Sequence, residues 1–179
     1  MTAGGTDDLR FPLGRFQKPD VISDQQIATW IGDLDALPGD LRRVVQPLSI
    51  EQLDTPYRPG GWTVRQVVHH LPDSHFNSFL RFKWALTEDH PTIKDYREDR
   101  FADLADYRDT PVGTSLDLLA ALHARWTTLL RSLDAAQLER EFVHPESGAT
   151  RLNLFRSVVF LPLENLSISV PGGTWNSRT

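Results

Sequence analysis

Three of the six histidines of this chain, His69, His70 and His75, fall within seven positions of one another in the stretch GGWTVRQVVHHLPDSHFNSFLRFK, residues 60–83. Imidazoles are common metal ligands and also transfer protons near neutral pH, so this group raises the question of a metal or catalytic site. Two histidines of one helix reach the same ion only when they are three or four residues apart. The separations here are one, five and six residues. A metal site on this helix therefore needs ligands from elsewhere in the chain.

The three histidines point in different directions if this stretch is helical, because successive residues are turned by about 100°. Apolar residues recur at three- and four-residue intervals along this helix and form a stripe: Val64, Val68, Leu71, Phe79, Phe82 and Leu86. His75 falls within this stripe, which predicts a core histidine hydrogen-bonded to a neighbouring helix. His69 points away from the stripe and is expected to be partly exposed. A line of polar residues follows one side of the helix: His70, Ser74, Asn77 and Arg81. This line is either a solvated face or the lining of a cavity, and we expect His70, Asn77 and Arg81 to face the same cavity.

The other histidines have no spacing that predicts chemistry. His90 is expected to be exposed in a connector, His123 to lie on the polar side of a helix, and His144 to lie in a turn. The chain has no cysteine, and therefore no disulfide, thiolate metal site or cysteine nucleophile. It also lacks a Gly-rich phosphate-binding loop and a nucleophile elbow. The candidates for chemistry are therefore the histidines of residues 60–83.

Composition narrows the class of protein. A hydrophobic content of 40% with 24% charged residues is typical of a soluble globular domain. A net charge of −5 argues against nucleic-acid binding, which depends on clustered Lys and Arg. No apolar run approaches the roughly 20 residues that span a bilayer. The N-terminus has no basic start followed by an apolar run, so we expect no signal peptide and a cytoplasmic protein with no membrane partner.

Periodic apolar residues predict four helices, one of which carries the histidines. The first should run over about 24–45, and the second from Trp62 or Thr63 to about Leu86. The third is expected over about 115–133. Its buried face should consist of Leu118, Leu119, Leu122, Trp126, Leu129 and Leu130. A fourth begins at Leu152, and because no strand-like alternation is present, the predicted fold is all-α, a four-helix bundle with long crossovers.

These helices also predict the domain organisation. Residues 1–10 should form a flexible tail, residues 11–160 the bundle, and residues 161–179 an irregular C-terminal tail. Pro162 sets the last boundary, because proline in a helix interior removes a backbone donor and costs roughly 3 kcal/mol. The fourth helix should therefore be short or disrupted, with no continuous helix through Pro162 to Val170, and the segment SVPGGTWNSRT should be coil.

Several segments together resemble the YfiT-like branch of the DinB-like superfamily. They are FPLGRFQKP, LDTPYRPGGWTVRQVVHHLPDSHFNSFLRFK, LTEDHP, LHARWTTLLRSL and FVHP, and they cover residues 11–145. The resemblance implies a four-helix bundle, often a homodimer, that binds zinc or nickel through three histidines and acts as a metal-dependent hydrolase. Similar proteins include bacillithiol S-transferases and, more distantly, mycothiol-dependent enzymes. The implied partner is a small-molecule substrate, including a low-molecular-weight thiol.

The resemblance assigns a role to one histidine. The first metal ligand of the family lies eight residues after a tryptophan and just before a leucine, which here is His70. Its other two ligands come from a His-x-x-x-His segment on the fourth helix, and this chain has no histidine after His144. Pro72 stands where the family usually has a small helix former, and it should kink the helix beside the site. The pocket candidates around His70 are Asp73, His75, Asn77 and Arg81.

Three hypotheses follow. The first is a metalloenzyme, a hydrolase or thiol S-transferase in which metal-activated water or thiol attacks a small electrophile. The second is a non-catalytic binding or dimerising bundle that has lost its metal. The third is a C-terminal sequence that arises from a shifted reading frame or another artificial change, since the resemblance ends abruptly after Pro145. With one of three ligands in place, we expect substoichiometric zinc or nickel and little metal-dependent thiol transfer.

Overall fold

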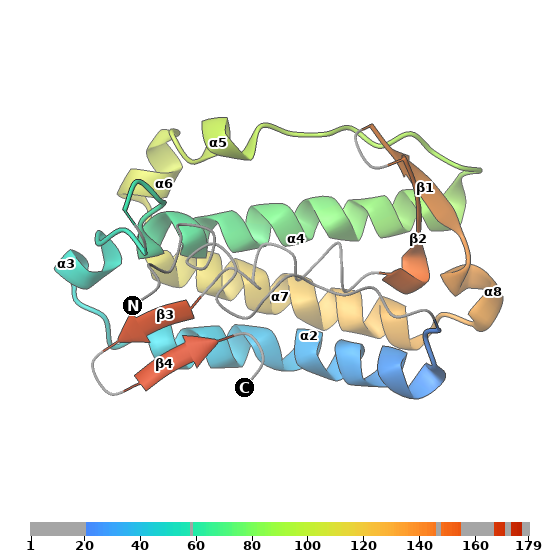
Figure 1. Ribbon diagram of the computed structural model, residues 1–179, viewed down its shortest axis with the longest axis horizontal. Helices are drawn as coiled ribbons and strands as arrows, with labels where there is room; N and C mark the ends of the chain where they lie inside the picture. The colour runs from blue at the N-terminus through green and yellow to red at the C-terminus, as the bar shows by residue number, and fades with distance from the viewer. Residues whose placement is uncertain (1–20, 58, 146–147, 155–166, 171–172, 177–179) are drawn as a thin grey trace, which may run out of the picture.

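The computed structural model describes residues 21–57, 59–145, 148–154, 167–170 and 173–176. Three long helices lie side by side along the molecule (Figure 1). They are α2 (Asp24–Val45), α4 (Val64–Thr87) and α7 (Val112–Arg131). α7 packs against both α2 and α4. The first three predicted helices are confirmed, close to their expected ends. No helix within the described ranges is long and apolar enough to cross a membrane.

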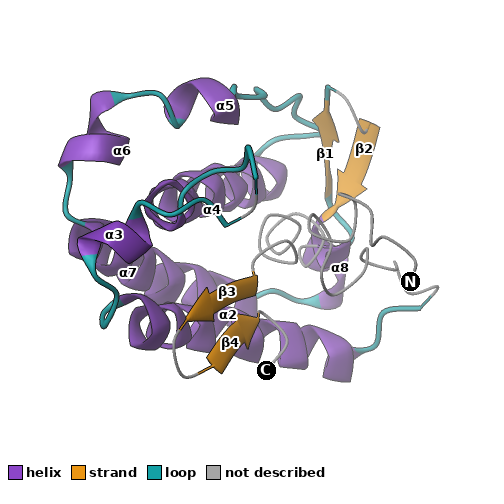
Figure 2. Cartoon of the chain, turned by 60° about the vertical axis from the view of Figure 1, so that its left-hand side comes forward, coloured by secondary structure: helices purple, strands orange, loops and turns teal. Residues whose placement is uncertain are grey.

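Shorter elements connect the long helices. The short helices are α3 (Ile50–Leu53), α5 (Glu98–Phe101), α6 (Ala105–Asp109), α8 (Ala135–Leu138) and the 3-10 helix η1 (Leu152–Leu154). The strands are β1 (Glu141–His144), β2 (Gly148–Arg151), β3 (Ser167–Val170) and β4 (Gly173–Asn176). The connector from α4 to α7, which contains α5 and α6, passes α4 on the side away from α2 (Figures 1 and 2).

The predicted cap at the start of α4 is present. The Thr63 hydroxyl accepts a hydrogen bond from the backbone N–H of Gln66, and the Gln66 side chain accepts one from the backbone N–H of Thr63. This reciprocal pair satisfies two backbone donors that the first turn of a helix leaves free. Pro72 lies inside α4, which continues beyond it to Thr87. The cap therefore fixes where the histidine-bearing turns begin, and Pro72 does not end the helix.

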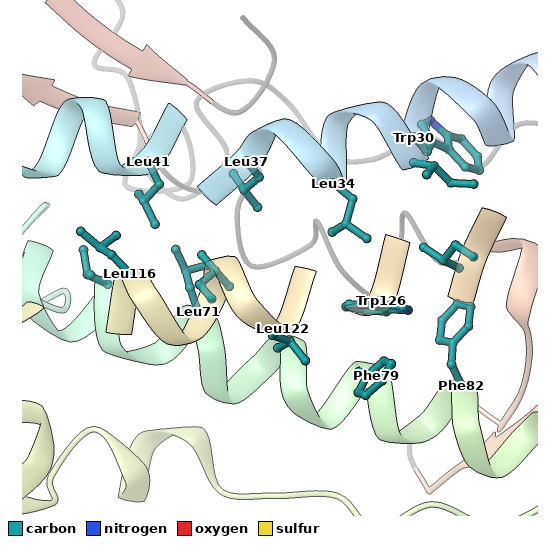
Figure 3. Close-up of a cluster of buried hydrophobic side chains, with 14 of the residues drawn as sticks. Trp30, Leu34, Leu37, Leu41, Leu71, Phe79, Phe82, Leu116, Leu122 and Trp126 are labelled. Atoms are coloured by element: carbon teal, nitrogen blue, oxygen red, sulfur yellow. The ribbon is translucent and has the colours of Figure 1, made fainter. Parts of the chain in front are cut away.

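The core fills the space between the three long helices. Its fully buried side chains come from all of them (Figure 3): Leu34 and Leu41 of α2, Leu71 and Phe82 of α4, and Trp126 of α7. Leu119 of α7 is fully buried as well. The apolar stripes predicted for α4 and α7 face each other there. One residue was misplaced, because Leu118 is 52% exposed. It is a neighbour of Leu119 in the chain, and the 100° turn per residue carries it off the buried face.

Two short hairpins are the main departure from the predicted fold. β1 pairs with β2, and β3 pairs with β4, both antiparallel. The expectation of no strands is therefore wrong, and so is the expected coil for SVPGGTWNSRT at residues 169–170 and 173–176. Each strand has four residues, too few for an alternating pattern to stand out. Because β3 occupies Ser167–Val170, the prediction that no continuous helix runs from Pro162 to Val170 is confirmed.

Three expectations lie outside the described residues. They are the flexible tail at 1–10, the course of the predicted fourth helix beyond Leu154, and the effect of Pro162. At its expected start the chain forms the 3-10 helix η1, and Leu152 is fully buried in the core.

Candidate functional site

Two faces of α4 are buried, and they differ in chemistry. The core face is defined by Leu71, His75, Phe79 and Phe82, and the polar face by His70, Ser74, Asn77 and Arg81. The connector and β1 both contact α4. The solvated interpretation of the polar line is therefore wrong for His70, Ser74 and Arg81, which are 5%, 7% and 9% exposed.

His70 is a buried, neutral imidazole at the start of the polar face. Its ring meets the Trp62 indole edge-on, with 4.9 Å between ring centroids. Burial lowers the pKa of His70 to about 4, because the charged ring would lose its hydration. The Nδ1 atom is buried and has no hydrogen-bond partner among the residues that the structure describes. At neutral pH the ring is therefore uncharged, which is the form that coordinates a metal or accepts a proton.

Arg81 lies three turns further along the same face. Its guanidinium makes no ion pair or hydrogen bond to the part of the chain that the structure describes. The nearest charged and polar influences come from the connector, at Asp95 and Tyr96. Burial raises the pKa of Tyr96, and a hydrogen bond with Ser74 partly offsets this rise. Arg81 is thus a cation enclosed by α4 and the connector.

Asn77 and Asp73 occupy the edge of the polar face. The Asn77 amide donates to the backbone carbonyl of Asp73 at 2.9 Å, within the helix. The Asp73 carboxylate accepts a hydrogen bond from the hydroxyl of Tyr107, in α6, at 2.7 Å. Burial raises the pKa of Asp73, while the Tyr107 hydrogen bond opposes this. Asp73 therefore fastens α6 to α4, and its Oδ2 is occupied by Tyr107.

His75 belongs to the core face and is paired there with His123 of α7. His123 Nδ1 lies 2.6 Å from the Leu34 carbonyl oxygen, and this nitrogen carries the proton because a carbonyl only accepts. In neutral His123 the Nε2 lone pair then accepts a hydrogen bond from His75 Nδ1, at 2.7 Å. Burial lowers the pKa of His123 to about 4. This chain of hydrogen bonds joins α2, α7 and α4 and confirms the core interpretation of His75.

The sequence interpretation missed two of the buried histidines. His123 is 1% exposed rather than on a polar side, and His69 is 4% exposed rather than partly exposed. His69 Nδ1 lies 2.7 Å from the Ser115 hydroxyl, which links α4 to α7. The spacing of His123 from Leu119 and Trp126, four and three residues, places it within the buried stripe of α7 and could have identified it.

The two remaining histidines lie outside α4. His90 is exposed as expected, with Nδ1 2.9 Å from the Asp89 carboxylate and a positive φ of 45°. His144 ends β1 rather than lying in a turn, and its Nε2 is 3.9 Å from the Asp95 carboxylate.

The side chains that could coordinate a metal ion, among the described residues, do not fit the three-histidine site that the resemblance implies. No three His, Cys, Asp or Glu side chains among the described residues are grouped so that they could hold an ion. His75 is committed to His123, and Asp73 accepts the Tyr107 hydroxyl. Of the pocket candidates, the structure places Arg81 and Asn77 on the polar face with His70, and Asp73 at its edge. It does not bring His75 there.

The long helices pack as a bundle with a buried, neutral histidine near the start of the second one. The sequence model of the DinB superfamily matches residues 33–164, and the chain belongs to this superfamily. A solved structure described as "YfiT from Bacillus subtilis is a probable metal-dependent hydrolase with an unusual four-helix bundle topology" matches with a TM-score of 0.84 and 43% identity. The match covers 88% of this chain and 91% of that one. The predicted family and four-helix-bundle fold are thus confirmed.

The curated relatives carry a consistent description. A protein of Bacillus mycoides (strain KBAB4) named "Putative metal-dependent hydrolase" is 53% identical over 145 residues, which are 81% of this chain and 83% of the relative. A protein of the same name from Bacillus cereus (strain 03BB102) is 52% identical over 146 residues, 82% and 84% of the two chains.

Proposed function

We propose that this chain acts on a small-molecule substrate as a metal-dependent hydrolase, or as a thiol transferase of related chemistry. The observation that carries the proposal is His70, a neutral and buried imidazole on the polar face of α4 whose Nδ1 has no hydrogen-bond partner among the described residues. The names of the relatives support the same reaction class. Zinc or nickel is the proposed metal, and the cytoplasm the proposed location.

The chain's own residues define what such a site offers. A neutral imidazole at His70 supplies one nitrogen ligand, and Trp62 shields one side of the ring from water. The described residues supply no second and third ligand, so affinity for metal should be low. We therefore expect activity only when metal is added in excess.

The experiment measures metal content and turnover on the same samples. The purified chain is dialysed, its zinc and nickel are counted, and hydrolysis of a panel of activated esters and amides is followed with and without added metal. The proposal expects substoichiometric metal and a metal-stimulated rate that His70→Ala abolishes. The exposed His90→Ala is the matched control and should keep the rate. A metal-stimulated rate that survives His70→Ala would contradict the assignment.

The second candidate is a non-catalytic binding or dimerising module of the same fold. It is favoured by a specific observation, the absence of any histidine after His144. It predicts no turnover at any metal concentration, together with a dimer in light scattering. Reading the coding DNA downstream of codon 150 in the other two frames adds a direct check. A His-x-x-x-His segment there would support the shifted-frame explanation of the C-terminal sequence, and its absence would exclude that explanation.

A further inference from the structure

Arg81 is a buried residue whose guanidinium has no ion-pair partner among the described residues. The residue is 9% exposed, and its guanidinium has no hydrogen bond or ion pair with any of the described residues. Other arginines behave differently: Arg65 is paired with Asp54 at 2.7 Å, and Arg131 with Asp35 at 2.7 Å. Enclosing a charge without a partner is expensive, and buried arginines are normally paired. The five N–H donors of the guanidinium therefore have no partner within the described ranges, at a residue that is 9% exposed.

The neighbours of Arg81 do not neutralise it. Asp95 and Tyr96 are close enough to influence its charge electrostatically, yet neither is within ion-pair or hydrogen-bond distance. Asp95 lies 3.9 Å from His144 Nε2, and its side chain is 43% exposed.

We propose that Arg81 binds the carboxylate of a small-molecule ligand held against the polar face of α4. A planar guanidinium and a carboxylate match in a bidentate pair, which satisfies the donors and the charge together. A phosphate dianion fits less well, because it places two charges on one group where the site offers a single cation that Asp95 already influences, whereas each carboxylate carries one charge. A carboxylate-bearing substrate is the class that this pairing selects.

The position of Arg81 relates it to the proposed function. Arg81 follows His70 by eleven residues, roughly 16 Å along the helix axis, and on the same side. Long helical side chains lean towards the helix N-terminus, which brings the guanidinium closer to His70. A substrate anchored at Arg81 would therefore extend towards His70. This step rests on the proposed function, whereas carboxylate binding at Arg81 does not require turnover.

The experiment titrates metal-free protein with succinate at constant ionic strength. Binding is followed by calorimetry and by the Arg81 Nε–Hε signal in a ¹H–¹⁵N spectrum, which is assigned by its loss in Arg81→Met. We expect saturable binding that shifts this signal. Neutral succinamide should bind at least about tenfold more weakly, as removal of a charged hydrogen-bond partner predicts. Inorganic phosphate should also bind more weakly, and phosphate binding tighter than succinate binding would overturn the carboxylate assignment.

Substituted proteins test whether succinate binds at Arg81 or is attracted by any arginine on the protein. Arg81→Met should weaken succinate binding at least about tenfold, and Arg81→Lys should fall between it and wild type, because a lysine keeps the charge without the planar fork. Arg43→Met removes an exposed arginine paired with Asp40 and should bind like wild type. Equal loss in Arg43→Met, or an Arg81 signal that does not move, would overturn the proposal. Should Arg81→Met not fold, Arg81→Lys and the wild-type signal still decide it. Because metal is absent throughout, failure of hydrolysis and failure of carboxylate binding are separate results.

Discussion

The two buried faces of α4 place their titratable side chains in different settings, although the core also contains polar atoms, such as Trp126 Nε1, with no hydrogen-bond partner among the described residues. On the core face, His75 is bonded to His123, whose other nitrogen is bonded to the Leu34 carbonyl. On the polar face, His70 Nδ1 and the Arg81 guanidinium have no hydrogen bond within the described ranges. Both faces belong to one helix and are similarly enclosed, so burial alone does not explain the difference.

Hydrogen-bonded groups such as His75 and His123 hold the helices together. Groups with no partner within the described ranges, such as His70 Nδ1 and the Arg81 guanidinium, are available to a ligand. A satisfied buried network adds stability and fixes how helices pack. A buried group without a partner costs stability, and such costs are tolerated where binding or catalysis needs the group. Substitutions on the core face should therefore lower stability more than matched substitutions on the polar face.

The largest effect should come from the centre of the core. Trp126 is fully buried and contacts the rings of Phe79 and Phe82. Trp126→Ala should lower the free energy of unfolding by about 3–5 kcal/mol, since it removes a large side chain and leaves a cavity. Leu118→Ala, on the exposed side of α7, should change it by less than about 0.5 kcal/mol. Chemical denaturation measures both, and equal losses would show that the core lies elsewhere.

Acid should destabilise both faces. The folded-state pKa of His70 and of His123 is about 4, below the ordinary value of 6.5. Between these values the unfolded chain takes up protons that the folded chain excludes, so stability is full above about pH 6.5 and falls as the pH drops towards 4. The loss should be about 3 kcal/mol per histidine. Denaturation across this range in His70→Gln and His123→Gln should each show a shallower fall, and an unchanged slope in both would contradict the buried-neutral assignment.

The contribution of each face to stability can be compared by replacing one histidine for each with leucine: His123, the partner of His75, for the core face, and His70 for the polar face. His123→Leu leaves the Leu34 carbonyl and the His75 Nδ1 donor without their partner, which should cost about 2 kcal/mol. His70→Leu breaks no hydrogen bond at Nδ1 and should cost less than about 1 kcal/mol. Both losses are measured by denaturation. Equal losses would show that the hydrogen-bond partners of His123 do not determine how much each histidine contributes to the free energy of unfolding.

Much of the fold could be read from local sequence signals. The capping pair Thr63 and Gln66 fixes the start of α4, and apolar spacing gives the stripes of α4 and α7. These signals are carried by residues three or four apart, so a single helix contains them. The hairpins were missed because Phe142 in β1 is held by its burial in the core rather than by a pattern within four residues.

The site could be predicted only in part, for a related reason. Direction around the helix correctly placed His75 in the core and grouped His70 with Arg81. The same geometry could not show that His75 pairs with His123, which is 48 residues away in the chain. It also could not show that the connector encloses Arg81 without pairing with it, because that depends on where Asp95 and Tyr96 lie after folding.

The smallest change in stability is expected at Arg81, and its sign is informative. Arg81→Met keeps an unbranched side chain and removes a charge that has no partner within the described ranges, so the free energy of unfolding should change by less than about 0.5 kcal/mol or rise. Arg65→Met is the matched control: it breaks the ion pair with Asp54 and should lose up to about 1 kcal/mol.

Without ligand, Arg81→Met should lose less stability than Arg65→Met. If the Arg81 guanidinium binds a carboxylate, this order should reverse when ligand is present. Succinate at ten times its dissociation constant should stabilise the wild type by about 1.4 kcal/mol, because it binds the folded state alone. Arg81→Met should gain much less, whereas Arg65→Met should gain as much as wild type. Thermal unfolding with and without succinate measures all three. A large loss in Arg81→Met without ligand would mean that the guanidinium already has a partner within the chain, and the contrast between the two faces of α4 would fail at its central residue.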